Sequence, residues 1–136
     1  MPDDSAAPAA GRVLVIEDEP TIRAALRRFF TRRGWTVDEA SDGRMGLEML
    51  LPASADRDYD VIVCDLRMPV LSGIELHDAV ARQRPELLGR MIFSSGDVVS
   101  PEAARFLVTT RCVVLEKPFP LAVLGDAVDR IRAAHR

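Results

Sequence analysis

Residues 61–65 read Val-Ile-Val-Cys-Asp, a short run of apolar side chains that ends on a carboxylate. The pattern recurs in Val-Leu-Val-Ile-Glu-Asp at residues 13–18, Met-Ile-Phe-Ser-Ser at residues 91–95 and Cys-Val-Val-Leu-Glu-Lys at residues 112–117. Short, continuously apolar runs are typical of strands buried on both faces of a parallel sheet. Because each run ends on a charged or hydroxyl group, we expect these groups to form a site beyond the carboxyl ends of the strands.

Helical segments separate the strands. Helices are predicted at residues 20–33, 43–51, 72–84, 100–108 and 120–135, and strands at residues 13–16, 35–40, 60–64, 90–94 and 112–115. Gly34 is expected to end the first helix, Asp42 to cap the second and Ser100 to cap the fourth. The alternation of strand and helix favours a doubly wound α/β fold with helices on both faces of the sheet.

Size and composition fit one ordinary globular domain, with 136 residues, 48% of them hydrophobic and 29% charged. Residues 1–11 are predicted as a disordered leader or linker remnant, and residues 12–136 as the domain. A net charge of −3 attracts neither nucleic acid nor an anionic membrane, and no apolar run approaches the ~18 residues of a membrane span. No signal-peptide pattern is visible, so we expect a cytoplasmic location with Cys64 and Cys112 as unpaired, buried thiols.

Lys117 is the only lysine among 18 lysine and arginine residues. A lysine is a compact point charge, whereas an arginine is a wide planar fork, so Lys117 indicates a place where the fork does not fit. Glu17, Asp18 and Asp65 are expected to meet nearby, and two carboxylates ~4 Å apart repel by about 4 kcal/mol at an effective dielectric near 20. Such a cluster must hold protons, gain a cation or sit apart in solvent. Its hard oxygen ligands suit Mg²⁺, and an aspartate beside Mg²⁺ and an ammonium group is able to accept a phosphoryl group.

Four motifs carry a family resemblance: Glu17-Asp18-Glu19-Pro20, Cys64-Asp65-Leu66-Arg67-Met68-Pro69 followed by Gly73, Ser95-Gly96, and Glu116-Lys117-Pro118-Phe119. From Arg12 to the C-terminus the chain resembles a response-regulator receiver domain of two-component signalling. The resemblance implies a flavodoxin-like (βα)5 three-layer sandwich with strand order 2-1-3-4-5. It also implies a cis Lys117–Pro118 peptide bond.

The resemblance assigns a role to each site residue. It makes Asp65 the phosphoacceptor, with Ser95 as the switch hydroxyl and Lys117 in contact with the phosphoryl group. It assigns the Mg²⁺ ligands to Glu17, Asp18, Asp65 and the backbone carbonyl of Arg67.

The resemblance also implies the partners. A phosphohistidine on a histidine kinase or histidine phosphotransfer protein is the donor in a phosphorelay, and the chain catalyses its own phosphorylation and dephosphorylation as a signalling receiver rather than an enzyme. The new phosphoryl group is expected to shift the face built from helix four, strand five and helix five toward a downstream protein. The run at residues 95–102 is similar to receivers of hybrid histidine kinases. A free-standing regulator and a weak homodimer are left open.

Three positions depart from the family pattern. Val114 stands where many receivers carry a switching Tyr or Phe, so output coupled to an aromatic side chain is not expected. Arg67 and Asp97 flank the phosphoryl position, and we hypothesise an ion pair across the site mouth, with two independent exposed charges as the alternative. Gly96, where relatives carry alanine, is expected to leave extra room.

Other functions fit the residues less well. A phosphohydrolase with an aspartate nucleophile needs a second acid two residues later, where this chain has Arg67. A nucleotide binder needs a phosphate cradle after the first strand, where Glu17, Asp18 and Glu19 would repel phosphate. The interpretation as a degenerate receiver that only binds proteins is weakened, because a suitable residue stands at every position that phosphoryl transfer requires. His77 is expected on the surface, and the arginines of the first helix on a solvated face or a docking face for an acidic partner.

Overall fold

A computed structural model describes residues 10–52, 58–96 and 100–135. In this part of the chain, strands and helices alternate in the following order: β1 (Arg12–Ile16), α1 (Pro20–Arg32), β2 (Thr36–Ala40), α2 (Gly43–Leu50), β3 (Val61–Asp65), α3 (Gly73–Gln83), η2 (Pro85–Arg90), β4 (Met91–Ser95), α4 (Pro101–Thr109), β5 (Val113–Glu116) and α5 (Leu121–Ala134). The five predicted strands and five predicted α-helices are confirmed. The short 3₁₀ helix η2 was not predicted.

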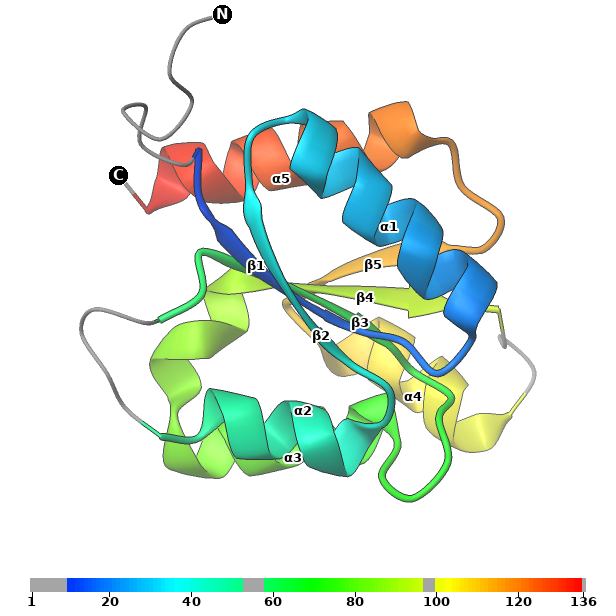
Figure 1. Cartoon of the computed structure of the whole chain (residues 1–136). Coiled ribbons are helices and arrows are strands. Elements are labelled where there is room, and N and C mark those ends of the chain that lie inside the picture. Colours follow the sequence, from blue (N-terminus) through cyan, green and yellow to red (C-terminus); the bar gives the residue numbers. More distant parts are fainter. Residues whose placement is uncertain (1–9, 53–57, 97–99, 136) are drawn as a thin grey trace, which may run out of the picture.

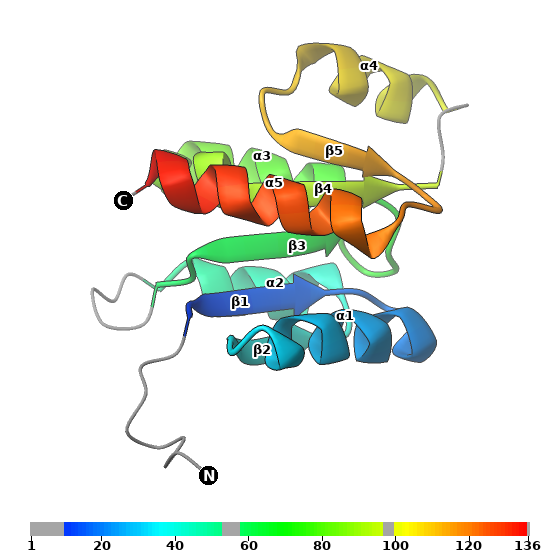
Figure 2. The same cartoon turned by 90° about the horizontal axis from the view of Figure 1, so that it is seen from above.

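The five strands form one parallel sheet in the order β2-β1-β3-β4-β5, as the resemblance implied. Helices α1 and α5 cover one face, and α2, α3 and α4 cover the other (Figure 1). Figure 2 shows the same sheet between its two layers of helices. The predicted three-layer α/β sandwich is therefore confirmed.

Two hydrophobic layers hold the helices to the sheet. Alternate strand residues face opposite sides, so Val13 and Val15 pack with α1 and α5 whereas Leu14 and Ile16 pack with the helices of the other face. β1, β3 and β4 are buried on both faces, which explains why their sequences lack polar alternation. Cys64 is buried, Cys112 is half-buried and both are free; burial raises the pKa of each thiol.

The predicted caps are present. Asp42 accepts a hydrogen bond from the Met45 N–H at 2.8 Å, and Ser100 accepts one from the Ala103 N–H at 3.1 Å. Ser72 forms a full capping box with Glu75 at the start of α3. Gly34 follows α1 with φ of 83°, the left-handed conformation that glycine adopts without strain.

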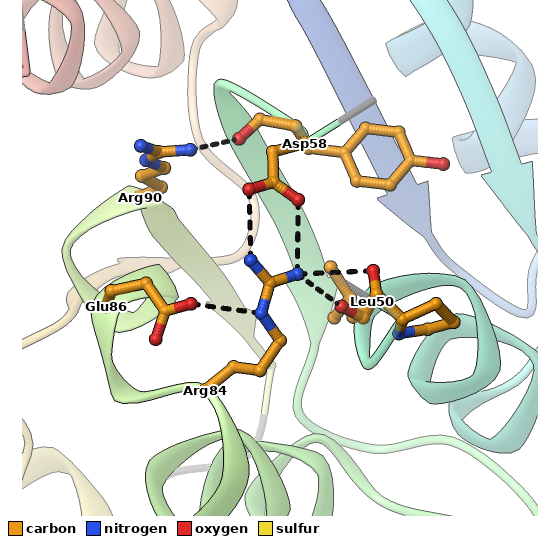
Figure 3. A network of polar contacts seen from close by, with 7 residues as sticks. Leu50, Asp58, Arg84, Glu86 and Arg90 are labelled. Carbon is orange, nitrogen blue, oxygen red and sulfur yellow. Dashed lines mark hydrogen bonds and ion pairs between the residues drawn. The ribbon is translucent and has the colours of Figure 1, made fainter. Parts of the chain in front are cut away.

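A buried arginine closes the amino end of the sheet. Arg84, 8% exposed, donates to both carboxylate oxygens of Asp58 at 3.0 and 3.1 Å, to Glu86 at 3.0 Å, and to the carbonyl oxygens of Leu50 at 3.0 Å and Pro52 at 3.4 Å (Figure 3). We call these five residues the Arg84 network. It ties the end of α2, the approach to β3 and the junction of α3 with η2 together.

The N-terminal segment contacts the domain at its last residues. The Ala10 N–H donates to the Gly34 carbonyl at 3.0 Å, and the Gly11 carbonyl accepts from the Thr36 N–H at 2.9 Å. The rest of the predicted leader, residues 1–9, lies outside the described residues, so the assignment of residues 1–11 as a leader stays a prediction. Among the helices described, none has the length and apolarity needed to cross a membrane.

Candidate functional site

The parallel register brings the predicted site residues to one edge of the sheet. Ile16 pairs with Cys64, so Glu17 and Asp18, which leave β1, lie beside Asp65 at the end of β3. The neighbouring strands add Ser95 from β4 and, one residue after β5, Lys117. Strand ends that are up to 100 residues apart in the sequence thus meet in space.

Three carboxylates gather at this edge. One oxygen from each of Glu17, Asp18 and Asp65 lies within 4.8 Å of the others. Glu17 is 1% exposed and Asp65 is 7% exposed, so both are poorly hydrated. Burial raises the pKa of Glu17, and the nearby charge of Asp65 raises it further. Burial also raises the pKa of Asp65, an effect that the Lys117 ammonium group opposes.

Lys117 joins two of these carboxylates. Its Nζ lies 3.3 Å from Oε1 of Glu17 and 3.2 Å from Oδ2 of Asp65. Burial disfavours its charge, but the two carboxylates outweigh burial and raise the pKa of Lys117. Its backbone N–H donates to the Ser95 carbonyl at 2.8 Å, and the Lys117–Pro118 peptide bond is cis, as predicted.

Backbone contacts hold the acidic residues in place. The Glu19 N–H donates to Oε2 of Glu17 at 3.2 Å, and the Arg67 N–H contacts Oδ1 of Asp65 at 3.4 Å. Gly73 allows α3 to begin directly behind Asp65, because an added Cβ at Gly73 would lie 2.4 Å from the Asp65 carbonyl oxygen. A methyl group there would push the β3 end out of position.

Several predictions concern residues at the rim. Ser95 is buried at the end of β4, and its role as the switch hydroxyl stays a prediction. Arg67 is exposed, and its carbonyl as a metal ligand also stays a prediction. Asp97 lies outside the described residues, so the hypothesis of an Arg67–Asp97 ion pair stays open. Val114 is partly buried against the core under α2, α3 and α4.

Two predictions about side-chain surroundings were incomplete. His77 is not a plain surface residue, because its ring makes edge-to-face contacts with Phe106 at 4.9 Å and Phe93 at 5.9 Å. Arg27, Arg28, Arg32 and Arg33 are exposed along α1 and its C-cap, as a solvated face requires, but Arg23 is partly buried. Arg23 and Arg27 also pair with Glu39 of β2, at 3.3 and 3.0 Å. Helix periodicity identified the exposed side of α1 but gave no signal of an acidic partner on the neighbouring strand.

The donor set fits a small divalent cation. The cluster offers three hard oxygen ligands, which is the chemistry that Mg²⁺ prefers in proteins. Glu17 and Asp65 share one ammonium group, so negative charge remains in excess around them. A divalent cation would remove this excess, which makes the residues present suitable to hold one.

The fold and this cluster together define a signalling module, and the match to known proteins agrees. The chain belongs to the response regulator receiver domain family, which it matches over residues 13–129. It is a receiver domain of two-component signalling rather than a conventional enzyme.

Relatives include both regulators and kinases. The chain is 42% identical over 126 residues to the transcriptional regulatory protein TcrA of Mycobacterium tuberculosis, covering 92% of this chain and 46% of that protein. It is 31% identical over 116 residues to the sensor kinase CckA of Brucella abortus, covering 85% of this chain and 12% of the kinase. The chain thus spans less than half the length of these two relatives.

A solved receiver structure is informative about the metal. The receiver domain of the sensor histidine kinase PA1611 of Pseudomonas aeruginosa, with a magnesium ion coordinated in its active site cleft, superposes with a TM-score of 0.76. The two chains are 25% identical, and the match covers 92% of this chain and 99% of that one. The predicted similarity to receivers of histidine kinases is therefore confirmed.

Proposed function

We propose that Asp65 accepts a phosphoryl group from a phosphohistidine on a partner, in a reaction that requires Mg²⁺, and that the chain switches conformation in response. The observation that carries this proposal is the meeting of a buried Asp65 with two further carboxylates and the Lys117 ammonium group at one edge of the sheet. Ionic groups of this kind are functional candidates when they lie at strand ends of a doubly wound fold.

The proposed reaction is an in-line displacement at phosphorus. A carboxylate oxygen of Asp65 forms the new P–O bond, while the P–N bond of the donor breaks and its electron pair leaves with the imidazole. Lys117 then exchanges its contact with Asp65 for one with the phosphoryl oxygens, and the Ser95 hydroxyl donates to another of them.

Magnesium, held by Glu17, Asp18, Asp65 and the Arg67 carbonyl, would neutralise charge on the transferred group. The same residues would support the later hydrolysis, in which water replaces the Asp65 oxygen on phosphorus. Asp18 and Glu17 would keep the metal in place for both reactions. The fit of the donor set and the magnesium ion of the PA1611 receiver support this assignment.

A groove beside the site supports docking of the donor. It has a volume of about 490 Å³, lies between α1 and the segment that joins β5 to α5, and its lining includes Ile22, Leu26 and Phe119 together with Glu17 and Lys117. An apolar groove that reaches the reactive edge suits a helix of a histidine kinase or histidine phosphotransfer protein. We propose that such a partner docks there, in the cytoplasm.

The output is proposed to pass through α4, β5 and α5. Ser95 and Lys117 occupy the ends of β4 and the β5–α5 segment, so movement of either side chain toward a phosphoryl group would displace this face. Val114 on β5 is too small to act as an aromatic switch, so the α4 position itself is the proposed readout for the downstream protein. A shift of this kind requires only that the phosphoryl group contact the two states differently.

Phosphorylation by a small donor tests the proposal. Incubation with acetyl phosphate and Mg²⁺, followed by intact-protein mass spectrometry, should detect one phosphoryl group on the wild type. The Asp65→Asn variant and a sample treated with chelator should show none. A beryllofluoride adduct should likewise require Mg²⁺ and Asp65. Phosphorylation that persists in Asp65→Asn would reject Asp65 as acceptor, and its absence from the wild type would favour a receiver that only binds partners.

A further inference from the structure

The guanidinium group of Arg23 links three elements next to the acidic cluster. Its NH1 donates to the backbone carbonyl oxygen of Glu17 at 2.8 Å, and its Nε lies 3.3 Å from Oε1 of Glu39. The Arg23 N–H also donates to the Glu19 carbonyl at 2.9 Å, within the first turn of α1. With 22% of its side chain exposed, Arg23 joins the start of α1, the end of β1 and the edge strand β2.

At Glu17 the hydrogen bonding of the chain changes from the sheet to a side chain. The Glu17 N–H still donates to the Ala40 carbonyl of β2 at 3.0 Å, which continues the β1–β2 ladder. The next peptide unit joins Glu17 to Asp18 and turns away from the strand toward α1. Its oxygen is the atom that Arg23 holds. Because the orientation of this peptide sets the direction in which Asp18 leaves the backbone, Arg23 acts on Asp18 without touching it.

Glu39 supplies the negative charge that faces the Arg23 guanidinium group. It lies opposite Val15 in the β1–β2 register and pairs with Arg23 and with Arg27, whose NH1 contacts both of its oxygens at 3.0 and 3.1 Å. An unpaired guanidinium so close to the acidic cluster would oppose a divalent cation. Glu39 holds the Arg23 side chain in its hydrogen-bonding geometry and offsets part of the field of Arg23 at the cluster, because Arg27 shares the same carboxylate.

We propose that Arg23 is a positioning residue that fixes the Glu17–Asp18 turn for divalent-cation binding, with Glu39 as its orienting partner. The proposal rests on the function above in one respect, since it takes Glu17 and Asp18 as metal ligands. Groups that orient metal ligands from behind typically change metal affinity 10–100-fold when they are removed.

Magnesium affinity, measured by isothermal titration calorimetry on the unphosphorylated chain, tests the proposal without any partner or turnover. Arg23→Gln should weaken Mg²⁺ binding about tenfold. Arg23→Lys should also weaken it, because a point charge is unable to hold the carbonyl and Glu39 with the same two-pronged geometry. Arg28→Lys, at an exposed position of the same helix, is the matched control and should bind Mg²⁺ as the wild type does.

The sign of the change separates positioning from simple charge. If Arg23 acted only as a nearby cation, Arg23→Gln would tighten Mg²⁺ binding, which would overturn the proposal. Unchanged affinity in Arg23→Gln and Arg23→Lys would overturn it as well. Glu39→Gln should weaken binding by a part of the same effect, and its combination with Arg23→Gln should be less than additive because both act through one contact.

A failure of the proposed function would look different. If the wild type itself bound no Mg²⁺, the assignment of Glu17 and Asp18 as ligands would fall, and the role of Arg23 with it. If the wild type bound Mg²⁺ and became phosphorylated while the Arg23 variants bound equally well, only the role of Arg23 would fall. Circular dichroism of each variant, with the wild-type spectrum expected throughout, would show that altered binding does not reflect unfolding.

Discussion

The two ends of the sheet carry ionic clusters of opposite design. At the amino end, one guanidinium group in the Arg84 network meets two carboxylates and two carbonyl oxygens, in a fork geometry that uses the planar shape of arginine (Figure 3). At the carboxyl end, Glu17 and Asp65 share the single ammonium group of Lys117, with Asp18 close by. Carboxylates outnumber cations in both clusters, but Asp58 and Glu86 of the first are 29% and 59% exposed to water, whereas Glu17 and Asp65 of the second are buried.

The two clusters also differ in how ionisation affects the folded state. In the Arg84 network, the hydrogen bonds that Arg84 donates to Asp58 raise the pKa of Arg84 further above its already high value, so the group is a permanent cation. At the site, burial raises the pKa of Asp65 and of Glu17, so ionisation of these two carboxyl groups destabilises the folded state. A cluster that stabilises the fold is satisfied by its own residues, while a cluster that acts requires something further to bind.

Removal of Arg84 should give the largest loss of stability. Arg84→Met keeps the apolar stem but leaves Asp58 and two carbonyl oxygens without their donor, which we expect to lower the free energy of unfolding by about 3 kcal/mol. Urea unfolding followed by circular dichroism measures this change. Arg82→Met, at an exposed position of the same helix, is the control and should change stability little. Equal stability of the two variants would mean that the Arg84 network does not stabilise the fold.

Mg²⁺ should stabilise the folded protein through the carboxylates at the carboxyl end of the sheet, and this gain should not depend on the Arg84 network. A cation that binds only the folded state raises the free energy of unfolding by about 2.7 kcal/mol when present at about a hundred times its dissociation constant. We expect this gain in the wild type and in Arg84→Met, and its loss in Asp65→Asn. Thermal unfolding with and without Mg²⁺, at constant ionic strength, is the measurement. A gain retained by Asp65→Asn would place the cation elsewhere.

Asp65→Asn should make the metal-free protein more stable at neutral pH. It removes one buried negative charge from a cluster that holds more carboxylates than cations, so we expect a higher free energy of unfolding. The folded pKa of Asp65 is raised above its ordinary value of 3.8, so the folded state binds more protons than the unfolded chain between these two values. Wild-type stability without metal should therefore rise as pH falls through this window, until other groups titrate.

The pH profile of Asp65→Asn should be flatter in the same window. Urea unfolding at several pH values, with a chelator present, compares the two proteins. A wild type that is more stable than Asp65→Asn at neutral pH without metal would contradict the view that this end of the sheet is electrostatically stressed.

Gly96→Ala should have the smallest effect. An added Cβ would lie 3.9 Å from Cδ of Lys117, an ordinary contact, so the site has the extra room that the sequence indicated. We expect a gain of about 0.5 kcal/mol in the free energy of unfolding, because alanine restricts the unfolded chain. Phosphorylation by acetyl phosphate should continue. Gly73→Ala, whose Cβ would lie 2.4 Å from the Asp65 carbonyl oxygen, is the contrasting variant and should impair both stability and phosphorylation.

The sequence predicted the strands and the site better than it predicted ionic partners. Continuous apolar runs are specific to doubly buried strands, so β1, β3 and β4 and the residues at their ends could be located. Helix η2 was missed because its six residues are too short to show a period. The partners of Arg23 and the aromatic contacts of His77 were missed because they come from other strands and helices, whose placement beside these residues is set by the fold.

Local sequence patterns and the tertiary structure therefore determined different features of this protein. Its sequence alone determined the alternation of strand and helix, and through its motifs the family, because hydrophobic period and short-range spacing are local properties of a chain. Only the tertiary structure decided that Lys117 reaches Glu17 and Asp65, that Arg23 holds the Glu17 carbonyl, and that Arg84 closes the opposite end. Such pairings depend on strand register and helix placement, which no local pattern specifies.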